Sequence, residues 1–193
     1  MSRHTPTPSG PFIIDTHELG RRPGSERRVE RVVPAPADLG IDVLGVTEGT
    51  DIALDLRLEA VLEGVLATGT ATARLTGECV RCLDPIDKDL TVPFQELYLY
   101  HDVEAELSED DLKLDDDYLD AEPLVRDAIV LSLPVNPVCR PDCMGLCPTC
   151  GFRLLDDPSH AHEEPIDARW AALTGLDVTV TDSDDVVSGD GRG

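Results

Sequence analysis

The sequence predicts an α+β protein: an antiparallel β-meander packed by one main helix, with a C-terminal cysteine-rich segment of the zinc-knuckle type. Three observations lead to this fold class. Apolar and polar residues alternate between residues 52 and 98, the period of two that is typical of strands with one buried face. One apolar stripe at helical spacing follows at residues 121–133. Four of the six cysteines then fall between residues 139 and 150.

The strands are predicted from this alternation. Residues 52–62 carry charged side chains on one face and apolar ones on the other, namely Leu54, Leu56, Leu58, Ala60 and Leu62. Residues 65–76 alternate small apolar residues with a ladder of threonines, which suits strand geometry. Residues 86–98 supply the next strand after a chain reversal. We therefore expect a meander with Cys79 and Cys82 at a hairpin tip.

The main helix is expected at residues 121–133. Asp120 can cap it and Pro123 suits its first turn. Its apolar stripe should pack on the buried face of the meander and consists of Leu124, Val125, Ala128, Ile129 and Leu131. Pro134 and Pro137 end the helix and deliver the chain to Cys139.

Composition divides the chain into three parts. Residues 1–27 are rich in proline and glycine and predict a flexible N-terminal arm, in which the patch at Phe12 could dock as an edge strand. Residues 28–155 form one domain. Residues 156–193 predict a mostly disordered acidic tail with a short helix at 166–173. The domain comprises a β-rich region, an acidic loop, the helix and the cysteine cluster, at residues 28–100, 102–120, 121–133 and 134–155.

The net charge of −23 bears on the partners. Such a chain repels phosphate backbones at long range and suits a basic protein partner. Residues 102–122 hold eleven acidic side chains and one lysine. We interpret this stretch as a solvated loop that can also dock a cationic partner, with the candidate partner-binding residues Asp110, Asp111, Asp115, Asp116 and Asp117.

A local basic group stands against this acidic background. It consists of Arg21, Arg22, Arg27, Arg28 and Arg31. These arginines either contact RNA or pair with the acidic face of their own chain, and we favour the intramolecular interpretation.

The sequence shows neither a signal peptide nor an apolar run long enough to span a membrane. We therefore expect a cytoplasmic protein with no membrane partner. Thiols stay reduced in that compartment, where close cysteine pairs bind metal more often than they form disulfides.

Two Cys-x-x-Cys turns make the cysteines candidate metal ligands. In the favoured arrangement, a two-knuckle site combines four thiols, those of Cys79, Cys82, Cys147 and Cys150. In the alternative, Cys139 and Cys143 replace Cys79 and Cys82, which are left as a free or redox-active pair. Four thiolates leave no open position for water, so the expected Zn²⁺ is structural. An iron–sulfur cluster or metal-free thiols remain as further readings.

Catalytic signals are weak. The sequence contains no phosphate-binding loop and no dinucleotide-binding glycine motif. His160 and His162 could be stand-in ligands, although a loop rich in aspartate, proline and histidine is usually only a loop. We expect no enzymatic activity and no small-molecule substrate, and a binding or assembly role is the default.

Three segments in order resemble a known family. They are GECVRCL at residues 77–83, LVRDAIVLSLP at 124–134 and CRPDCMGLCPTCG at 139–151. This combination resembles the bacterial YceD family of large ribosomal RNA subunit accumulation proteins, in its actinobacterial form, over roughly residues 30–155. The resemblance implies a non-enzymatic role in accumulation or processing of 23S rRNA, and it supplies no catalytic residues.

The acidic charge and a link to ribosomal RNA lead to one hypothesis and two alternatives. The hypothesis is that the protein holds a basic ribosomal protein or assembly factor until the large ribosomal subunit precursor takes it, and so acts on 23S rRNA indirectly. The first alternative is a direct RNA-binding zinc module that uses the arginines at residues 21–31. The second is a thiol-redox sensor that uses Cys79 and Cys82.

Overall fold

The computed structural model describes residues 9–101, 112–162 and 169. The chain divides into two units, residues 1–158 and 159–193, and the first contains every helix and strand described below. Six strands form the main sheet: β2 (Glu26–Pro34), β3 (Leu39–Ile41), β4 (Leu44–Val46), β5 (Asp51–Ala60), β6 (Gly64–Glu78) and β7 (Pro85–Leu99). A second sheet pairs β1 (Ile13–Asp15) with β8 (Tyr118–Asp120), and one helix, α1 (Glu122–Ser132), follows β8.

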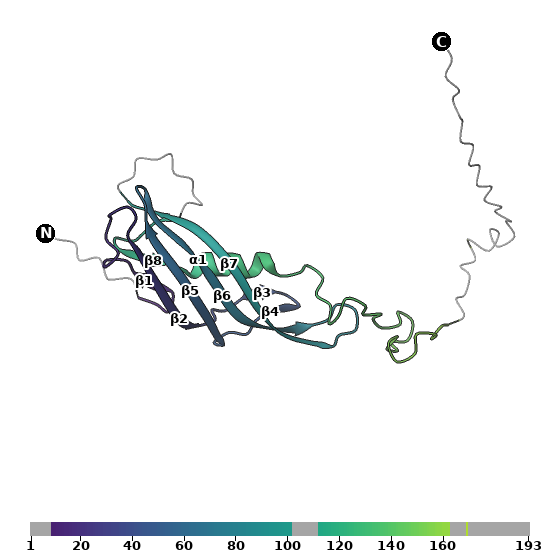
Figure 1. The fold of residues 1–193 in the computed structure, drawn as a ribbon. Coiled ribbons are helices and arrows are strands. Elements are labelled where there is room, and N and C mark those ends of the chain that lie inside the picture. Colours follow the sequence, from purple (N-terminus) through teal and green to yellow (C-terminus); the bar gives the residue numbers. More distant parts are fainter. Residues whose placement is uncertain (1–8, 102–111, 163–168, 170–193) are drawn as a thin grey trace, which may run out of the picture. The chain divides into compact units, whose positions relative to one another are not determined.

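Strand β6 lies at the centre of the main sheet (Figure 1). It pairs with β7 over its full length, and its other edge pairs first with β5 and then with β4. β2 flanks β5, β3 flanks β4, and every pairing in the sheet is antiparallel. The meander predicted for residues 52–98 is thus present as β5, β6 and β7. The mostly β architecture with one helix agrees with the predicted α+β class.

The alternation read from the sequence separates the two faces of the sheet. The inner face of β5 is fully buried and consists of Ile52, Leu54, Leu56, Leu58 and Ala60. The outer face is polar, and the Thr72 and Thr91 hydroxyls lie 2.9 Å apart across β6 and β7. Leu62 was expected on the apolar face but is 84% exposed, because β5 ends at Ala60 and Leu62 lies in the following turn.

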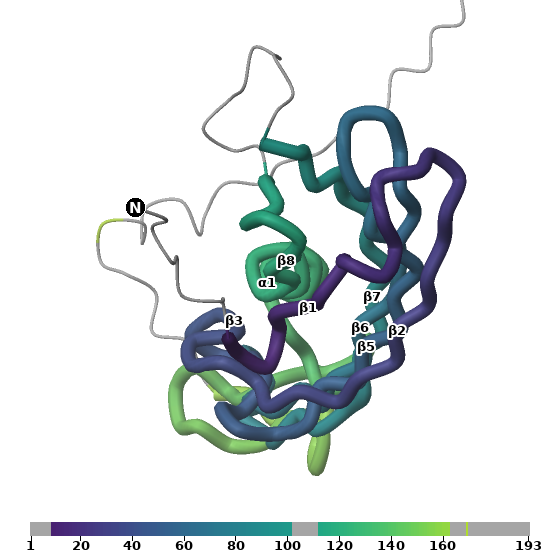
Figure 2. Tube along the Cα trace, turned by 90° about the vertical axis from the view of Figure 1, so that its left-hand side faces the viewer, coloured from purple at the N-terminus to yellow at the C-terminus, as the bar shows by residue number. Residues whose placement is uncertain are grey.

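Helix α1 packs against the inner face of the sheet, which curves around it (Figure 2). Its buried residues are Leu124, Val125 and Ile129, as the apolar stripe predicts, whereas Leu131 in the last turn is exposed. The N-cap is Ala121 and not the expected Asp120, because α1 begins at Glu122. The Asp120 carboxylate still accepts a hydrogen bond of 2.9 Å from the Glu122 backbone N–H, a free donor of the first turn. No helix among the described residues has both the length and the apolar character needed to cross a bilayer.

Residues 9–27 differ from the flexible arm that their composition predicts. Phe12, Ile14 and Leu19 are buried in the core, and β1 pairs with β8. Thr16 reinforces this contact, since its backbone N–H and its hydroxyl both donate to the carbonyl of Asp117 at 2.8 Å. The expectation that the patch at Phe12 docks as an edge strand agrees with β1. Its partner strand lies about a hundred residues away, which local composition does not reveal. The short helix expected at residues 166–173 lies outside the described residues, apart from residue 169.

Candidate metal centre

Two chain segments meet at the end of the β6–β7 hairpin. The turn at residues 79–84 joins the two strands. Within this turn, the Val80 N–H donates to the Pro137 carbonyl at 3.0 Å, and the Arg81 carbonyl accepts from the Leu146 N–H at 3.1 Å. The segment that follows α1 is therefore fixed against the hairpin tip by backbone hydrogen bonds.

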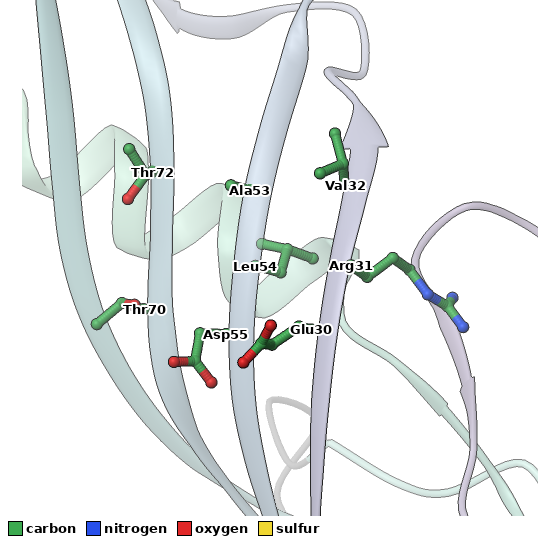
Figure 3. A pocket seen from close by; sticks show the side chains of 8 residues that line it. All are labelled: Glu30, Arg31, Val32, Ala53, Leu54, Asp55, Thr70 and Thr72. Atoms are coloured by element: carbon green, nitrogen blue, oxygen red, sulfur yellow. The ribbon is translucent and has the colours of Figure 1, made fainter.

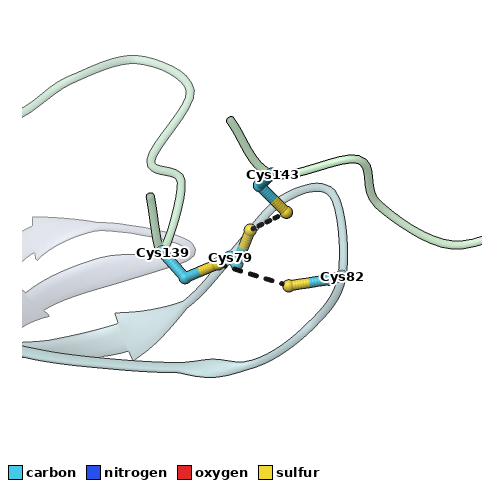
Figure 4. A group of neighbouring side chains, drawn as sticks. All are labelled: Cys79, Cys82, Cys139 and Cys143. Atoms are coloured by element: carbon cyan, nitrogen blue, oxygen red, sulfur yellow. Dashed lines mark hydrogen bonds between the residues drawn. The ribbon is translucent and has the colours of Figure 1, made fainter. Parts of the chain in front are cut away.

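This packing brings four cysteines together (Figure 4). The sulfur atoms of Cys79 and Cys143 lie 3.8 Å apart, and those of Cys82 and Cys139 lie 3.5 Å apart. All four sulfurs lie within 4.8 Å of one another. A tetrahedral zinc with Zn–S bonds of about 2.3 Å separates its sulfurs by about 3.8 Å. The donor set and spacing therefore fit a tetrahedral metal ion, and this group could hold one.

The first two ligands are presented by a tight turn. The Leu83 N–H donates to the Cys79 carbonyl at 2.9 Å, and the Cys79 N–H donates to the Asp84 carbonyl at 2.8 Å. The Arg81 N–H points at the Cys79 sulfur, 3.4 Å away. A backbone donor to sulfur stabilises a thiolate, whether free or bound to metal. The turn thus orients both thiols to the same side.

The four thiols are not electrostatically equivalent. Burial disfavours the Cys79 thiolate, but hydrogen bonds from the backbones of Cys139, Arg81 and Cys82 outweigh it and lower the Cys79 pKa to about 6. The Asp84 backbone favours the Cys82 thiolate, yet burial and the neighbouring sulfurs raise the Cys82 pKa to about 12. Burial also raises the pKa of Cys139. Among these three thiols the Cys79 thiol ionises most readily, and a metal ion that binds here must displace protons from Cys82 and Cys139.

Three arginines lie in the two chain segments that meet at the cysteines. Arg81 donates from its guanidinium to the Cys143 carbonyl at 2.9 Å, which ties the hairpin turn to the opposite ligand segment. Arg153 forms an ion pair with Asp84. Arg140 directly follows Cys139 in the chain. Positive charge next to four sulfurs offsets the net negative charge of a tetrathiolate metal centre.

The structure groups the cysteines differently from both arrangements weighed from the sequence. Cys79 and Cys82 lie with Cys139 and Cys143, whereas Cys147 belongs to a separate turn with Cys150. That second turn has its own closing hydrogen bond of 2.8 Å, from the Gly151 N–H to the Cys147 carbonyl. The two-residue spacing within each Cys-x-x-Cys turn predicts only the local shape of that turn. The path of the chain after α1 determines which cysteines lie next to Cys79 and Cys82.

The histidines considered as stand-in ligands belong to the second unit of the chain. Their Nε2 atoms lie 3.0 Å apart, and the two rings meet edge to face. This contact joins His160 and His162 to each other.

The candidate acidic docking residues are described in part. Asp110 and Asp111 lie outside the described residues. Asp115 and Asp116 are exposed in the turn that precedes β8, where Asp116 has a left-handed φ of 54°. Asp117 is half-buried, and its carboxylate lies 3.3 Å from the His17 ring nitrogen. Asp115 and Asp116 thus remain accessible to a partner, while Asp117 also holds β1 in place.

The basic group at residues 21–31 contacts its own chain. Arg31 donates to the carbonyls of Pro11 and Ile13, and Arg27 donates to the carbonyl of Asp15. These contacts stitch β2 to the N-terminal segment. Further contacts join Arg28 to Asp55 at 3.7 Å and place Arg21 over the Tyr100 ring at 4.6 Å, while Arg22 is exposed. The geometry favours the intramolecular interpretation of these arginines.

A shallow hollow lies on the outer face of the sheet, between β2, β5 and β6 (Figure 3). Glu30 and Asp55 occupy directly opposed positions on β2 and β5, and both line this hollow. Ala53 and Thr72 form its smaller walls, whereas the Arg31 side chain points away toward β1. Two carboxylates opposite each other on neighbouring strands repel, and Arg28, 3.7 Å from Asp55, offsets part of this repulsion within the chain.

Comparison with known proteins places this chain in a family. Residues 67–177 match the family model of the large ribosomal RNA subunit accumulation protein YceD. An uncharacterized protein of Mycobacterium tuberculosis is 43% identical over 181 residues, which cover 90% of this chain and 87% of the relative. An uncharacterized protein of Mycobacterium leprae is 38% identical over 169 residues, which cover 86% and 77%. No solved structure matches this chain significantly. The chain belongs to the YceD family of large ribosomal RNA subunit accumulation proteins.

Proposed function

We propose that this protein is a non-enzymatic factor that supports accumulation and processing of 23S rRNA and assembly of the large ribosomal subunit. The observation that carries this proposal is the family match, which covers the hairpin tip, α1 and every cysteine. Much of the matched segment is a folded sheet and helix, and its four clustered cysteines could hold a metal ion between the hairpin tip and the segment after α1. Such an architecture suits binding and positioning of a partner.

The proposed mode of action is indirect: the protein holds a basic ribosomal protein or assembly factor until the pre-subunit takes it. The net charge of −23 supports this mode, because it attracts basic proteins and repels RNA phosphates. Glu30 on the outer sheet face and the exposed Asp115 and Asp116 offer carboxylates to such a partner. Four of the five arginines at residues 21–31 are engaged within the chain, which weakens the case for direct RNA contact through them.

The proposed metal is a structural Zn²⁺ held by Cys79, Cys82, Cys139 and Cys143. The fit of the four sulfurs to a tetrahedral ion supports this assignment. Zinc with four thiolate ligands keeps no open position for water, so its contribution is to folding. These residues would tie the segment after α1 to the hairpin tip.

The first experiment tests the role in rRNA accumulation. The gene is deleted in the organism of origin, and the ratio of mature 23S to 16S rRNA is measured with and without a wild-type copy. We expect the ratio to fall in the deletion strain and to recover with the wild-type copy. An unchanged ratio under conditions of rapid growth would remove the proposed function.

The second experiment tests the proposed acidic docking site, which we call the cradle and which consists of Asp110, Asp111, Asp115, Asp116 and Asp117. The tagged protein is isolated from its own cells at moderate salt, with and without nuclease, and bound ribosomal proteins are identified by mass. A basic ribosomal protein that remains bound after nuclease supports the indirect mode, whereas 23S RNA that nuclease releases supports direct RNA binding.

A charge-matched pair of variants locates the acidic contact. The cradle variant replaces five aspartates with asparagine: Asp110, Asp111, Asp115, Asp116 and Asp117. The control variant makes the same replacement in the C-terminal tail at Asp177, Asp182, Asp184, Asp185 and Asp190. Both variants lose the same five negative charges. Weaker capture by the cradle variant alone supports a local docking site, and equal weakening points to net charge.

A further inference from the structure

Exposed apolar side chains gather around the metal-competent cysteines. We call residues 79–84 and 134–155 together the cysteine end. Ten large hydrophobic side chains are exposed among the described residues, and six belong to this end: Val80, Leu83, Val135, Met144, Phe152 and Leu155. A seventh, Leu131, lies in the last turn of α1, which leads into the same end. A concentration of this kind marks an interaction surface, whereas exposed apolar residues scattered singly are ordinary.

Backbone hydrogen bonds join these side chains into one structural unit. The Arg81 carbonyl accepts from Leu146, the Gly145 carbonyl accepts from Leu154, and the Phe152 carbonyl accepts from Cys147. The hairpin turn and the loop of residues 144–155 therefore lie side by side. The exposed Val80 and Leu83 sit on one part of this unit, and Met144 and Phe152 on the other.

Leu83 is held in a strained backbone conformation. Its φ is 60°, in the left-handed region that is unfavourable for a residue with a bulky apolar side chain. The second cysteine turn shows the unstrained solution: Gly151, with φ of 72°, occupies the same position after its second cysteine. Each residue donates its N–H to the carbonyl of the first cysteine of its own turn, at 2.9 Å for Leu83 and 2.8 Å for Gly151.

Burial of the Leu83 side chain does not offset the unfavourable backbone conformation. Its side chain is 62% exposed, so it contributes little to the core. A glycine would make the same turn with less strain. Strained residues of this kind cluster at functional sites. The strain and the exposure together point to a role for the Leu83 side chain outside the folded chain itself.

The charge of the cysteine end also differs from that of the whole chain. This end carries three arginines and two aspartates, against a net charge of −23 for all 193 residues. Arg81 and Arg153 are engaged with the Cys143 carbonyl and with Asp84. A nearly neutral surface with methionine, phenylalanine and arginine has the composition of a protein–protein interface core. Because Arg81 and Arg153 are engaged within the chain, this surface offers few free cations to a phosphate backbone.

We infer that the cysteine end is a docking surface for an apolar segment of a basic protein, with Leu83 as the central anchor. The inference rests on the proposed function, in which the acidic body attracts a basic partner. The negative charge of the rest of the chain then attracts that partner, and the exposed apolar side chains of the cysteine end bind it. The proposed metal ligands lie within this end, so metal binding would assemble the surface.

A second copy of this chain fits the surface poorly. A second copy would bring another charge of −23 against the first. A short apolar segment with basic flanks does not meet this repulsion.

The test uses the full-length, metal-loaded protein and a defined probe: RNA-free proteins extracted from the large ribosomal subunits of the same organism. Immobilised wild type is compared with Leu83→Gly and with the matched control Leu62→Gly. Leu62 is also an exposed leucine, but it lies in the turn at the opposite end of β6. Captured proteins are quantified by mass spectrometry, and thermal unfolding of each variant is recorded.

We expect Leu83→Gly to reduce capture of a basic protein about tenfold, as loss of one well-buried leucine contact does. Its unfolding midpoint should be equal to or above that of the wild type, because glycine relieves the strained φ. Leu62→Gly should capture as the wild type does. Unchanged capture by Leu83→Gly, no capture by the wild type, or a dimer of this chain that Leu83→Gly dissolves would each overturn the inference.

The outcome is separable from that of the proposed function. A fall in the 23S to 16S ratio on deletion, together with unchanged capture by Leu83→Gly, leaves the function standing and removes this surface. A Leu83-dependent capture in a strain whose rRNA ratio does not change on deletion supports the surface and removes the rRNA role.

Discussion

The Cys82 and Cys139 sulfur atoms lie 3.5 Å apart, although 57 positions separate the two residues in the chain. The turn of the β6–β7 hairpin holds the first, and the segment that leaves α1 holds the second. A metal ion bound to both closes a loop that contains β7, β8 and α1. Closing a loop of this length restricts the unfolded chain, so a metal ion bound here would couple its binding to folding.

The ligand set is tested by single serine substitutions. We expect Cys139→Ser and Cys143→Ser each to weaken the metal site at the hairpin tip, because each removes one of four sulfurs. The thermal midpoint should fall by several degrees, since 1 kcal/mol corresponds to roughly 2–4 °C at this chain length. Cobalt substitution followed by the thiolate–cobalt charge-transfer absorption measures how many sulfurs bind.

Cys150→Ser is the informative control for the ligand set. Cys150 is exposed and lies outside the group at the hairpin tip. The sequence-based arrangement makes it a ligand of the same ion as Cys79, and the structure does not. Loss of the metal from Cys79 and Cys82 in Cys150→Ser would favour the sequence-based arrangement.

Oxidation of the metal-free protein tests the same geometry in another way. Diamide accepts two electrons and two protons for each pair of thiols that becomes a disulfide. The closest sulfurs across the two segments are those of Cys82 with Cys139 and of Cys79 with Cys143. We expect peptide mapping to find these cross-segment disulfides. A dominant Cys79–Cys82 disulfide would contradict the geometry and favour the redox pair weighed from the sequence.

Tyr98 predicts an alkaline limit to stability. Its buried hydroxyl donates to the Asp120 carbonyl at 2.8 Å, and burial, with Asp120 and Glu96 nearby, raises its pKa well above 10. Folding therefore favours the neutral phenol. This contribution is fully present below about pH 10, the unfolded value, and is lost as the pH rises toward the folded pKa. Urea unfolding between pH 8 and 11 should show this decline.

Tyr98→Phe separates the two parts of that effect. At pH 8 we expect it to lower the free energy of unfolding by about 1 kcal/mol, because one hydrogen bond is lost. Above pH 10 its stability should decline less steeply than that of the wild type. Parallel declines would show that other groups govern the alkaline limit.

Gly69 on β6 pairs with Leu56 on β5. A Cβ atom at this position would lie far inside van der Waals contact of the Asp55 backbone carbonyl on the neighbouring strand. Gly69→Ala must push two paired strands apart, and we expect a loss of about 1–3 kcal/mol in the free energy of unfolding. Thr70→Ala, one residue further along on the outer face, should cost less. Equal losses at the two positions would mean that the strands adjust freely.

The long strands could be predicted from the sequence because their signal is local. Each residue of β5 reports its own face through its polarity, so the period of two is enough to define the strand. The three-residue strands β1 and β8 carry no measurable period. Their pairing depends on contacts between segments about a hundred residues apart, such as Thr16 with Asp117. Local residue propensities do not predict which distant segments pair.

The sequence predicts that the cysteines form a metal-ligand site, but it does not predict which four of them lie together. The two Cys-x-x-Cys turns are visible in the sequence, and the structure contains both as turns closed by the same hydrogen bond. The partner of Cys79 and Cys82 depends on the contact between Val80 and Pro137. That contact is set by where α1 ends over the sheet, which is a property of tertiary packing.

The four-cysteine group also imposes an order of events during synthesis. Cys79 and Cys82 leave the ribosome well before their partners, and at roughly 5–20 residues per second the 57 positions between Cys82 and Cys139 take roughly 3–11 s. In that interval the nascent chain displays a pair of thiols on an incomplete hairpin. A metal ion bound here would gain its third and fourth sulfur ligands only after Cys139 and Cys143 have emerged. The complete site would therefore form only after β7, β8 and α1 have been synthesised.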